Sequence, residues 1–309
     1  MKSAFLPVGL LLALLVAWLE PAPGSSLKDA GLIPWAVVAI FLVNGYQTNL
    51  AELPRNRQFI YVVVAAGVIN LLLAPVIGLA AAGVAGLSAG ATLGLVVKST
   101  VPSTLSTCIV LTQLAGGYGL WALVMTLILN IVGVFTLPFI LDLLLTQSGN
   151  LAIDPLALLL KLVQLVLLPF LIGIGLRRIS TLDPHHPVLQ YLPSSCVIAA
   201  VWMSLSSSSS LFTNLQWHTL LTIALVSIAV HLLLMVLAGL SGKLLKLEWQ
   251  AQVALIFTAS QKTLPVAVSV LAALNNSVGE ALLVCVMFHF LQVLIDSTLP
   301  KAVRRWSQG

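Results

Sequence analysis

Two stretches of the sequence place lysine, hydroxyl residues and proline inside apolar runs. They are Lys98-Ser99-Thr100-Val101-Pro102-Ser103-Thr104, within the run 84–114, and Ser260-Gln261-Lys262-Thr263-Leu264-Pro265, within the run 249–273. A charge at the centre of a bilayer costs roughly 2.5–3.5 kcal/mol on insertion scales, so such residues normally face a cavity or a partner. Proline breaks or kinks a helix, and the freed backbone groups must be satisfied by protein or cavity water. We therefore predict two broken helices that meet and form a solute site.

The chemistry of these stretches favours an anion. The lysines supply cationic donors, the hydroxyl and amide side chains supply neutral donors and acceptors, and the N-termini of half-helices add positive ends. No carboxylate lies in these two runs or in the run 119–141, and we expect Asp296 to lie too far along the last run to take part. The summed positive field favours an anionic solute, or a site in which an ammonium replaces a metal ion. A lysine that exchanges a proton would also couple proton movement to solute movement.

Other polar residues inside apolar runs extend the candidate site. Thr126 and Asn130 are four residues apart and share one helix face, where they line the cavity or make a helix–helix hydrogen bond. His289 and Gln292 are also candidates, whereas a lone histidine such as His231 is more often a packing donor. The full set of candidate binding residues is Lys98, Pro102, Ser103, Thr104, Ser106, Thr107, Thr112, Thr126, Asn130, Ser260, Gln261, Lys262, Thr263, Pro265, His289 and Gln292. Asn44 and Gln47 lie near the cytoplasmic end of their run, so we expect them to be interface residues and not ligands.

The composition indicates an integral membrane protein. Of 309 residues, 60% are hydrophobic and 7% are charged, whereas soluble domains average about 25% charged residues. The three cysteines fall in separate apolar runs without metal-binding spacing, so we expect them to pack as small apolar side chains. Because there is no HExxH motif, no pair of intramembrane aspartates and no nucleotide-binding loop, we expect neither an enzyme nor a primary pump, and no cofactor.

Ten apolar runs have about the length that a membrane-spanning helix needs. They lie near 4–19, 30–48, 58–80, 84–114, 119–141, 153–176, 186–210, 216–241, 249–273 and 278–299. Turn residues mark short connections at 20–26 and 147–150. The first run also resembles a secretory signal peptide, but we expect a retained helix because the loop after it lacks a clean small-x-small cleavage site.

The loop charges predict the orientation. With the N-terminus in the cytoplasm, ten basic residues fall on the cytoplasmic side and only Lys28 on the other, which is a strong positive-inside bias. Both termini are then cytoplasmic, in the plasma (cell inner) membrane. These loop positions explain the net charge of +5 without a nucleic-acid partner. Lys161, about two turns into its run, is expected to snorkel toward the interface.

Ten spans suggest two halves of five, about 1–145 and 146–309. An odd number of spans inverts the second half, as in inverted-repeat transporters, where broken segments at matching positions mark the binding site. Lysine precedes proline by four residues in the fourth span and by three in the ninth. The alternative is that both prolines only kink packed helices.

Three ordered motifs resemble those of the bile acid:sodium symporter superfamily, and most closely its divergent SBF-like branch. They are the run from Pro102 to Gly117, the Gln261-Lys262-Thr263-Leu264 motif, and His289 followed three residues later by Gln292. The resemblance implies an all-α fold in which spans 4 and 9 are broken and cross inside a core of spans 3–5 and 8–10. This core moves against a panel of spans 1–2 and 6–7, and solute and ions bind at the crossing.

The sequence departs from the sodium-coupled relatives of that superfamily at one charge. Their ninth helix carries an E-x-G-x-Q-N pattern, and here Gln261 is kept while Phe257 takes the place of the carboxylate. The resemblance would put sodium, if it is retained, at Thr112, Thr126 and Gln261. Because losing the carboxylate removes the charge balance of such a site, we assign no residue as a metal ligand.

Two functions follow from these observations. The first is a symporter-like secondary active transporter that moves an organic anion, with sodium or a proton as coupling ion. The second is a non-transporting membrane regulator of calcium influx, which some members of the divergent branch resemble. The expected partners are the lipid bilayer, a small organic anion and the coupling ion, and homo-oligomerisation is left open.

Overall fold

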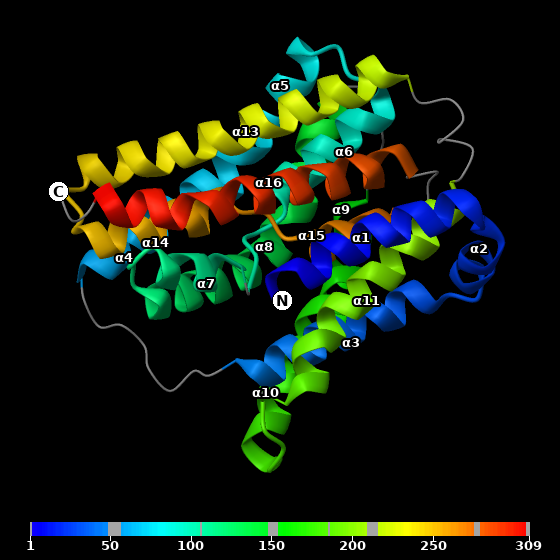
Figure 1. Ribbon diagram of the computed structural model, residues 1–309, viewed down its shortest axis with the longest axis horizontal. Coiled ribbons are helices and arrows are strands. Elements are labelled where there is room, and N and C mark those ends of the chain that lie inside the picture. Colours follow the sequence, from blue (N-terminus) through cyan, green and yellow to red (C-terminus); the bar gives the residue numbers. More distant parts are fainter. Residues whose placement is uncertain are drawn as a thin grey trace.

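The computed structural model describes residues 2–48, 57–105, 107–147, 154–184, 186–208, 216–274 and 279–306. This described part is helical and contains no strand, which confirms the all-α prediction (Figure 1). The first half contains α1 (Lys2–Leu19), α2 (Pro21–Asp29), α3 (Leu32–Gln47), α4 (Arg57–Gly67), the π-helix η1 (Val68–Leu73), α5 (Ala74–Val84), α6 (Ala89–Thr100), α7 (Thr107–Leu114) and α8 (Gly119–Gln147). The second half contains α9 (Pro155–Leu162), the π-helix η2 (Val163–Leu167), α10 (Leu168–Ile179), α11 (Pro187–Ser206), α13 (Trp217–Leu244), α14 (Trp249–Ser260), α15 (Leu264–Ala273) and α16 (Gly279–Trp306).

Among the described residues, seven stretches are long and apolar enough to cross a membrane. They are Arg57–Val84, Gly119–Leu145, Pro155–Ile179, Pro187–Ser206, Trp217–Leu244, Trp249–Ala273 and Gly279–Pro300. The bent pair α1 and α2 would make an eighth. The protein is therefore a multi-pass integral membrane protein. Each of the ten predicted runs falls on a helix or a broken pair of helices, and the count of ten spans stays a prediction.

The connection after α1 differs from the prediction. Residues 20–26 were expected to form a turn because they are rich in Pro, Gly and Ser, but residues 21–29 form α2, bent by 100° from the helix before it. Pro21 opens this helix, where a missing backbone N–H is harmless and the fixed φ angle suits the first turn. Most of the predicted connection at 147–150 lies outside the described residues.

The helices gather into two groups in Figure 1. α1, α2, α3, α10 and α11 pack together at the lower right, beside a larger group that includes α4, α6, α13, α14 and α16. Glycines allow the closest approach in the first group: a Cβ at Gly173 would overlap the Leu42 carbonyl oxygen, and one at Gly45 would overlap the Phe170 carbonyl oxygen. The backbones of α3 and α10 therefore touch directly.

The helix breaks lie at the predicted prolines. α6 ends at Thr100, and extended backbone containing Pro102 leads toward α7. α14 ends at Ser260, extended residues Gln261–Thr263 follow, and Pro265 stands in the first turn of α15. Another interruption, the π-helix η1, lies in a neighbouring span, and wide turns of this kind are frequent at functional sites.

Candidate functional site

The two extended breaks contact each other through their backbones. The amide of Thr263 donates a hydrogen bond of 2.9 Å to the carbonyl of Pro102. Broken helices leave the carbonyls of their last turn without intrahelical partners, so the crossing needs further donors. It receives them from two lysines, one on each broken span.

The lysines bind the backbone of the opposite break. The Lys98 ammonium donates to the carbonyl oxygen of Lys262 at 2.9 Å, and the Lys262 ammonium donates to the Val101 oxygen at 3.1 Å and also to the Asn70 oxygen. Both side chains are fully buried. The sequence prediction that both lysines reach the crossing is therefore met. Their ammonium groups are directed at backbone carbonyls.

Asn70, in η1, fixes the second break from the other side. Its Nδ2 donates to the carbonyl oxygens of Ala259 at 2.9 Å and Gln261 at 3.0 Å. Asn70 is not among the residues predicted from the sequence. A buried amide inside the otherwise apolar run 58–80 is the signal that could have found it.

Gln292, on α16, contacts the same segment. Its Oε1 accepts a hydrogen bond of 2.9 Å from the Lys262 amide, and its Nε2 lies 3.4 Å from the Lys262 carbonyl oxygen. His289, one turn earlier, is buried. The Lys98 ammonium also lies 5.9 Å from the centre of the Phe288 ring, within the range of a cation–π interaction.

Asp296 corrects a prediction. It was expected to lie too far along the last span, but its side chain is fully buried and accepts a hydrogen bond of 2.7 Å from Gln261 Nε2. Its other oxygen lies 2.8 Å from Nε2 of His231. The helical rise of 1.5 Å per residue puts position 296 only about 6 Å beyond Gln292, which brings it opposite Gln261. His231, interpreted from sequence as a packing donor, is therefore one half of a buried carboxylate–imidazole pair.

Thr126 and Asn130 lie on the face of α8 that covers the first break. Asn130 Nδ2 donates to the carbonyls of Ser103 at 3.0 Å and Thr126 at 2.8 Å. The hydroxyl of Thr126 lies 3.1 Å from the Cys108 sulfur, a contact between α7 and α8. Thr126 therefore makes the expected contact between helices, whereas Asn130 supports the break, and neither residue lines the larger cavity beside the crossing.

A cavity of about 90 Å³ separates the crossing from α1, α3 and α11. Thr104 and Thr107 border it on one side, and Thr263 and Pro265 border it on another. Its remaining lining residues are Leu6, Ile40, Phe41, Asn44, Leu105, Pro193, Ser194, Val197 and His289. The cavity thus meets the first turns of α7 and α15. Asn44 was expected at an interface and instead lines this space, whereas Gln47 does bind backbone carbonyls of Pro184 and Leu189.

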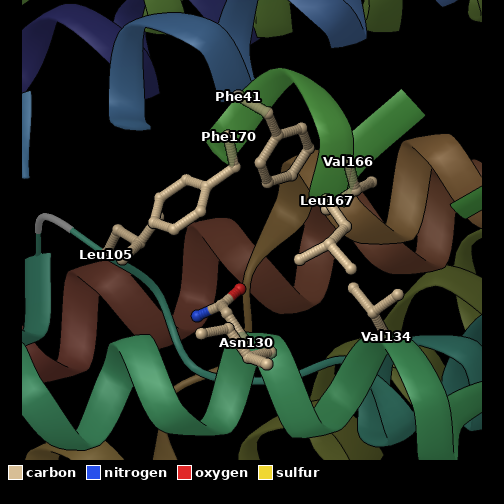
Figure 2. Close-up of a pocket in the computed structure, with 8 residues that line it drawn as sticks. Phe41, Leu105, Asn130, Val134, Val166, Leu167 and Phe170 are labelled. Atoms are coloured by element: carbon tan, nitrogen blue, oxygen red, sulfur yellow. The ribbon is translucent and has the colours of Figure 1, made fainter. Parts of the chain in front are cut away.

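A smaller apolar pocket lies beside this cavity. Figure 2 shows the Asn130 amide pointing from α8 toward the rings of Phe41 and Phe170 and the side chain of Leu167. Its volume is about 10 Å³, which is about the room of one water. Phe41 and Leu105 line both spaces, so these two side chains separate them.

The remaining candidates take different positions. Ser260 donates to the Ile256 carbonyl within its own helix. The hydroxyls of Ser103 and Thr112 are buried without a hydrogen-bond partner among the described residues. Ser106 lies outside the described residues. Lys161 does not reach for the interface as expected, because its ammonium donates to the carbonyl of Ala273 at the end of α15, at 2.8 Å.

Metal ligation finds little support in the described part of the chain. It contains no group of three His, Cys, Asp or Glu side chains that could hold an ion. Gln261, one of the three positions considered for sodium, uses its amide nitrogen for Asp296 and its amide oxygen for the Thr104 hydroxyl. Both ends of its amide are therefore already hydrogen-bonded within the protein.

Comparison with known proteins decides the family. The model of the SBF-like CPA transporter family matches residues 4–305, nearly the whole chain. The chain belongs to this family. Since the SBF-like family is one of transporters, the match confirms both the resemblance read from the sequence and the prediction that the protein is not an enzyme.

Curated relatives of this SBF-like protein agree with that assignment. Two are named probable sodium/metabolite cotransporter BASS4, chloroplastic. The rice protein (Oryza sativa subsp. japonica) is 27% identical over 99% of this chain and 76% of its own. The Arabidopsis thaliana protein is 26% identical over 96% of this chain and 71% of its own. An uncharacterised Pseudomonas aeruginosa protein is 26% identical over 66% of this chain and 63% of its own.

Proposed function

We propose that this SBF-like protein is a secondary active transporter that moves a small organic anion, with sodium or a proton as coupling ion. The observation that carries the proposal is the cavity at the crossing, bordered by the first turns of α7 and α15. The plant relatives' names mention sodium and a metabolite, which supports ion-coupled transport of an organic solute.

The charge distribution at the crossing supports an anion. The N-terminal ends of helices carry partial positive charge and the C-terminal ends partial negative charge. At this crossing, α7 and α15 direct N-terminal ends toward the cavity, while the carbonyl ends of α6 and α14 lie away from it. Half-helix N-termini bind anionic groups of substrates in other transporters, and the unwound carbonyls coordinate the cation.

The lysines contact the unwound carbonyls directly. Lys98 and Lys262 donate hydrogen bonds to carbonyls in both breaks, as expected if a lysine amine replaces a lost metal ion. The cavity keeps neutral donors at its wall, from Thr104, Thr107 and Thr263. An anionic solute in the cavity would contact positive helix ends and hydroxyl groups. Among the described residues, no lysine lines the cavity, so the cavity does not hold an unpaired buried charge, which would be unfavourable.

The size of the cavity limits the solute. About 90 Å³ is several times the roughly 10–15 Å³ that one water needs, so the cavity has room for a small solute. A small carboxylate such as pyruvate is therefore our first test solute. The finer architecture belongs to the same proposal: ten spans in two inverted repeats, a core that moves against a panel, and both termini in the cytoplasm. The two breaks, at 101–105 and 261–263, are the features that support the repeat.

Uptake into liposomes tests the proposal. Purified full-length protein is reconstituted, and uptake of radiolabelled pyruvate and other small carboxylates is measured with a sodium gradient, with a pH gradient and with neither. We expect accumulation driven by one of the two gradients. Absence of uptake for every anion under every gradient contradicts the proposal, and calcium influx in cells that express the protein then tests the regulator alternative.

Two adjacent serines on α11 provide a matched control. Ser194 lines the cavity, whereas Ser195, on the same helix, is exposed and lines a separate groove against α1. We expect Ser194→Phe to fill the cavity and abolish uptake, and Ser195→Phe to leave uptake near the wild-type rate. Equal loss in both variants would mean that transport does not use this cavity.

A further inference from the structure

A chain of hydrogen bonds connects the buried carboxylate of Asp296 to the cavity. Gln261 Nε2 donates to Asp296 Oδ2 at 2.7 Å, and Gln261 Oε1 accepts from the hydroxyl of Thr104. The Thr104 oxygen lies 2.8 Å from the hydroxyl of Thr107. Thr104 and Thr107 line the cavity, whereas Gln261 and Asp296 are fully buried. The chain therefore runs from the protein interior to the solute space.

The charge on Asp296 dictates the direction of every donor in this chain. An ionised carboxylate only accepts hydrogen bonds, so it fixes the NH₂ group of Gln261 toward itself and the amide oxygen toward Thr104. Thr104 must then donate to Gln261, and its oxygen accepts the proton of Thr107. As a result, Thr107 has no proton left for the cavity and presents only lone pairs to a solute.

A protonated carboxyl reverses the chain. The proton bound to Asp296 Oδ2 makes this oxygen a donor, so the Gln261 amide turns over and accepts from it. The amide nitrogen then donates to Thr104, Thr104 donates to Thr107, and the hydroxyl proton of Thr107 points into the cavity. No covalent bond changes except the one that binds the added proton.

We infer that Asp296 is a proton-binding site whose occupancy switches Thr107 from hydrogen-bond acceptor to donor, and so couples proton binding to anion binding in the cavity. This inference rests on the proposed anion transport. It assigns the proton coupling to Asp296, which was not expected to take part, instead of to the lysines. Buried ionisable groups inside membrane spans commonly mark proton relays.

Several titratable groups surround Asp296. Those on elements packed against α16 are Lys98 on α6, Cys108 on α7, Tyr191 and Cys196 on α11, His218, His231 and Lys243 on α13, and Lys262 after α14. α16 itself also carries Glu280, Cys285 and His289 and, in its last turns, Lys301, Arg304 and Arg305. Of the described residues, His231 and Gln261 are the two that hydrogen-bond the carboxylate.

His231 is the competing proton carrier. Its Nδ1 is buried without a partner among the described residues, and a proton bound there would leave Asp296 ionised and Gln261 in place. His231→Gln separates the two readings, because a glutamine can still donate to Asp296 Oδ1 but does not titrate. We expect this variant to keep the proton-dependent switch.

Infrared difference spectroscopy tests the switch without requiring transport. Spectra of the reconstituted full-length protein are compared between acidic and mildly alkaline buffer. We expect a carboxylic acid band at acidic pH that Asp296→Asn removes, together with an amide side-chain band that Gln261→Leu removes. Glu280→Gln is the matched control. Glu280 is another carboxylate on α16, and it accepts a hydrogen bond from Ser88, which is not part of the hydrogen-bond chain of Asp296. If no carboxylic acid band depends on Asp296, or if His231→Gln removes the response, the inference is overturned.

The affinity for pyruvate tests the link to the cavity. Because a hydrogen bond to a charged group contributes about 1.5–3 kcal/mol, we expect binding to be roughly ten- to a hundredfold tighter at acidic pH. We expect Asp296→Asn and Thr107→Val to lose this pH dependence, and Thr107→Ser to retain it. Wild-type binding that does not change with pH overturns the coupling. A complete lack of pyruvate binding at either pH counts against the proposed solute, and the spectra then decide the switch separately.

Discussion

The ammonium of Lys98 lies 2.9 Å from the main-chain oxygen of Lys262, while the ammonium of Lys262 serves carbonyls of Val101 and Asn70. Each broken span thus supplies a lysine that hydrogen-bonds the backbone of the other. Buried carbonyls without donors are strongly unfavourable in a membrane. These hydrogen bonds therefore hold the two breaks together in addition to side-chain packing.

Replacing Lys98 should destabilise the crossing. In Lys98→Met the Lys262 carbonyl loses its 2.9 Å donor, and a poorly satisfied buried group costs about 1–3 kcal/mol. We expect a lower thermal unfolding temperature in detergent. Lys243→Met, at an exposed lysine of α13, should change it little. An equal decrease in both variants would contradict the structural role of Lys98.

The two lysines should also be energetically coupled. Loss of either one loosens the same crossing, so the second substitution removes interactions that are already weakened. In a double-mutant cycle of Lys98→Met and Lys262→Met, measured by denaturant unfolding, we expect the double variant to be less destabilised than the sum of the single variants, by about 0.5–3 kcal/mol. Additive effects would show that each lysine supports its own break independently.

The pair of His231 and Asp296 should be more sensitive to losing one partner than to losing both. His231→Leu leaves the buried Asp296 carboxyl without its imidazole partner. Removing one partner of a buried pair typically costs about 3–5 kcal/mol, whereas replacing both by apolar residues is often nearly neutral. We therefore expect His231→Leu to unfold at a lower temperature than the double variant His231→Leu/Asp296→Leu. His218→Leu, exposed at the start of the same helix, is the control. A double variant less stable than His231→Leu would argue against a dependence of Asp296 on its imidazole partner.

Two glycines of α10 should differ sharply in their tolerance of alanine. A Cβ at Gly173 would overlap the backbone of α3 at Leu42, whereas a Cβ at Gly175 meets nothing within 4 Å. Gly173→Ala should destabilise the protein by about 1–3 kcal/mol through overpacking. Gly175→Ala should be neutral or slightly stabilising, because alanine has the higher helix propensity. Size-exclusion profiles and unfolding temperatures of the two variants test this, and similar values would mean that α3 and α10 are not in direct contact.

The sequence predicted the breaks because their signals are local. A lysine and a proline inside an apolar run violate the rules for a continuous span, and both breaks lie at those residues. The directions of the lysine side chains were not predictable, since they depend on which carbonyls the crossing leaves free. Asp296 was missed for a related reason: its role depends on how α16 is rotated against α13 and α14, and periodicity along one helix does not report this rotation.

Two other features did not follow from the composition: the helix that begins at Pro21 and the role of Asn70. Pro21 lies in a segment with the residues of a turn, yet proline is also a good first residue of a helix, and the chain forms α2 there. Asn70 was passed over because it is a single amide in a long apolar run, and the local π-helix that directs it toward the second break has no clear sequence signal. Whether the assembled residues bind solute stays a prediction until uptake is measured.

Lys161 helps to hold α9 against α15. Its ammonium closes the last turn of α15 at Ala273, far along that helix from the cavity-lining Pro265. A hydrogen bond from a lysine contributes only a few kcal/mol at most, so it ties the end of α15 to α9 without fixing the two helices permanently.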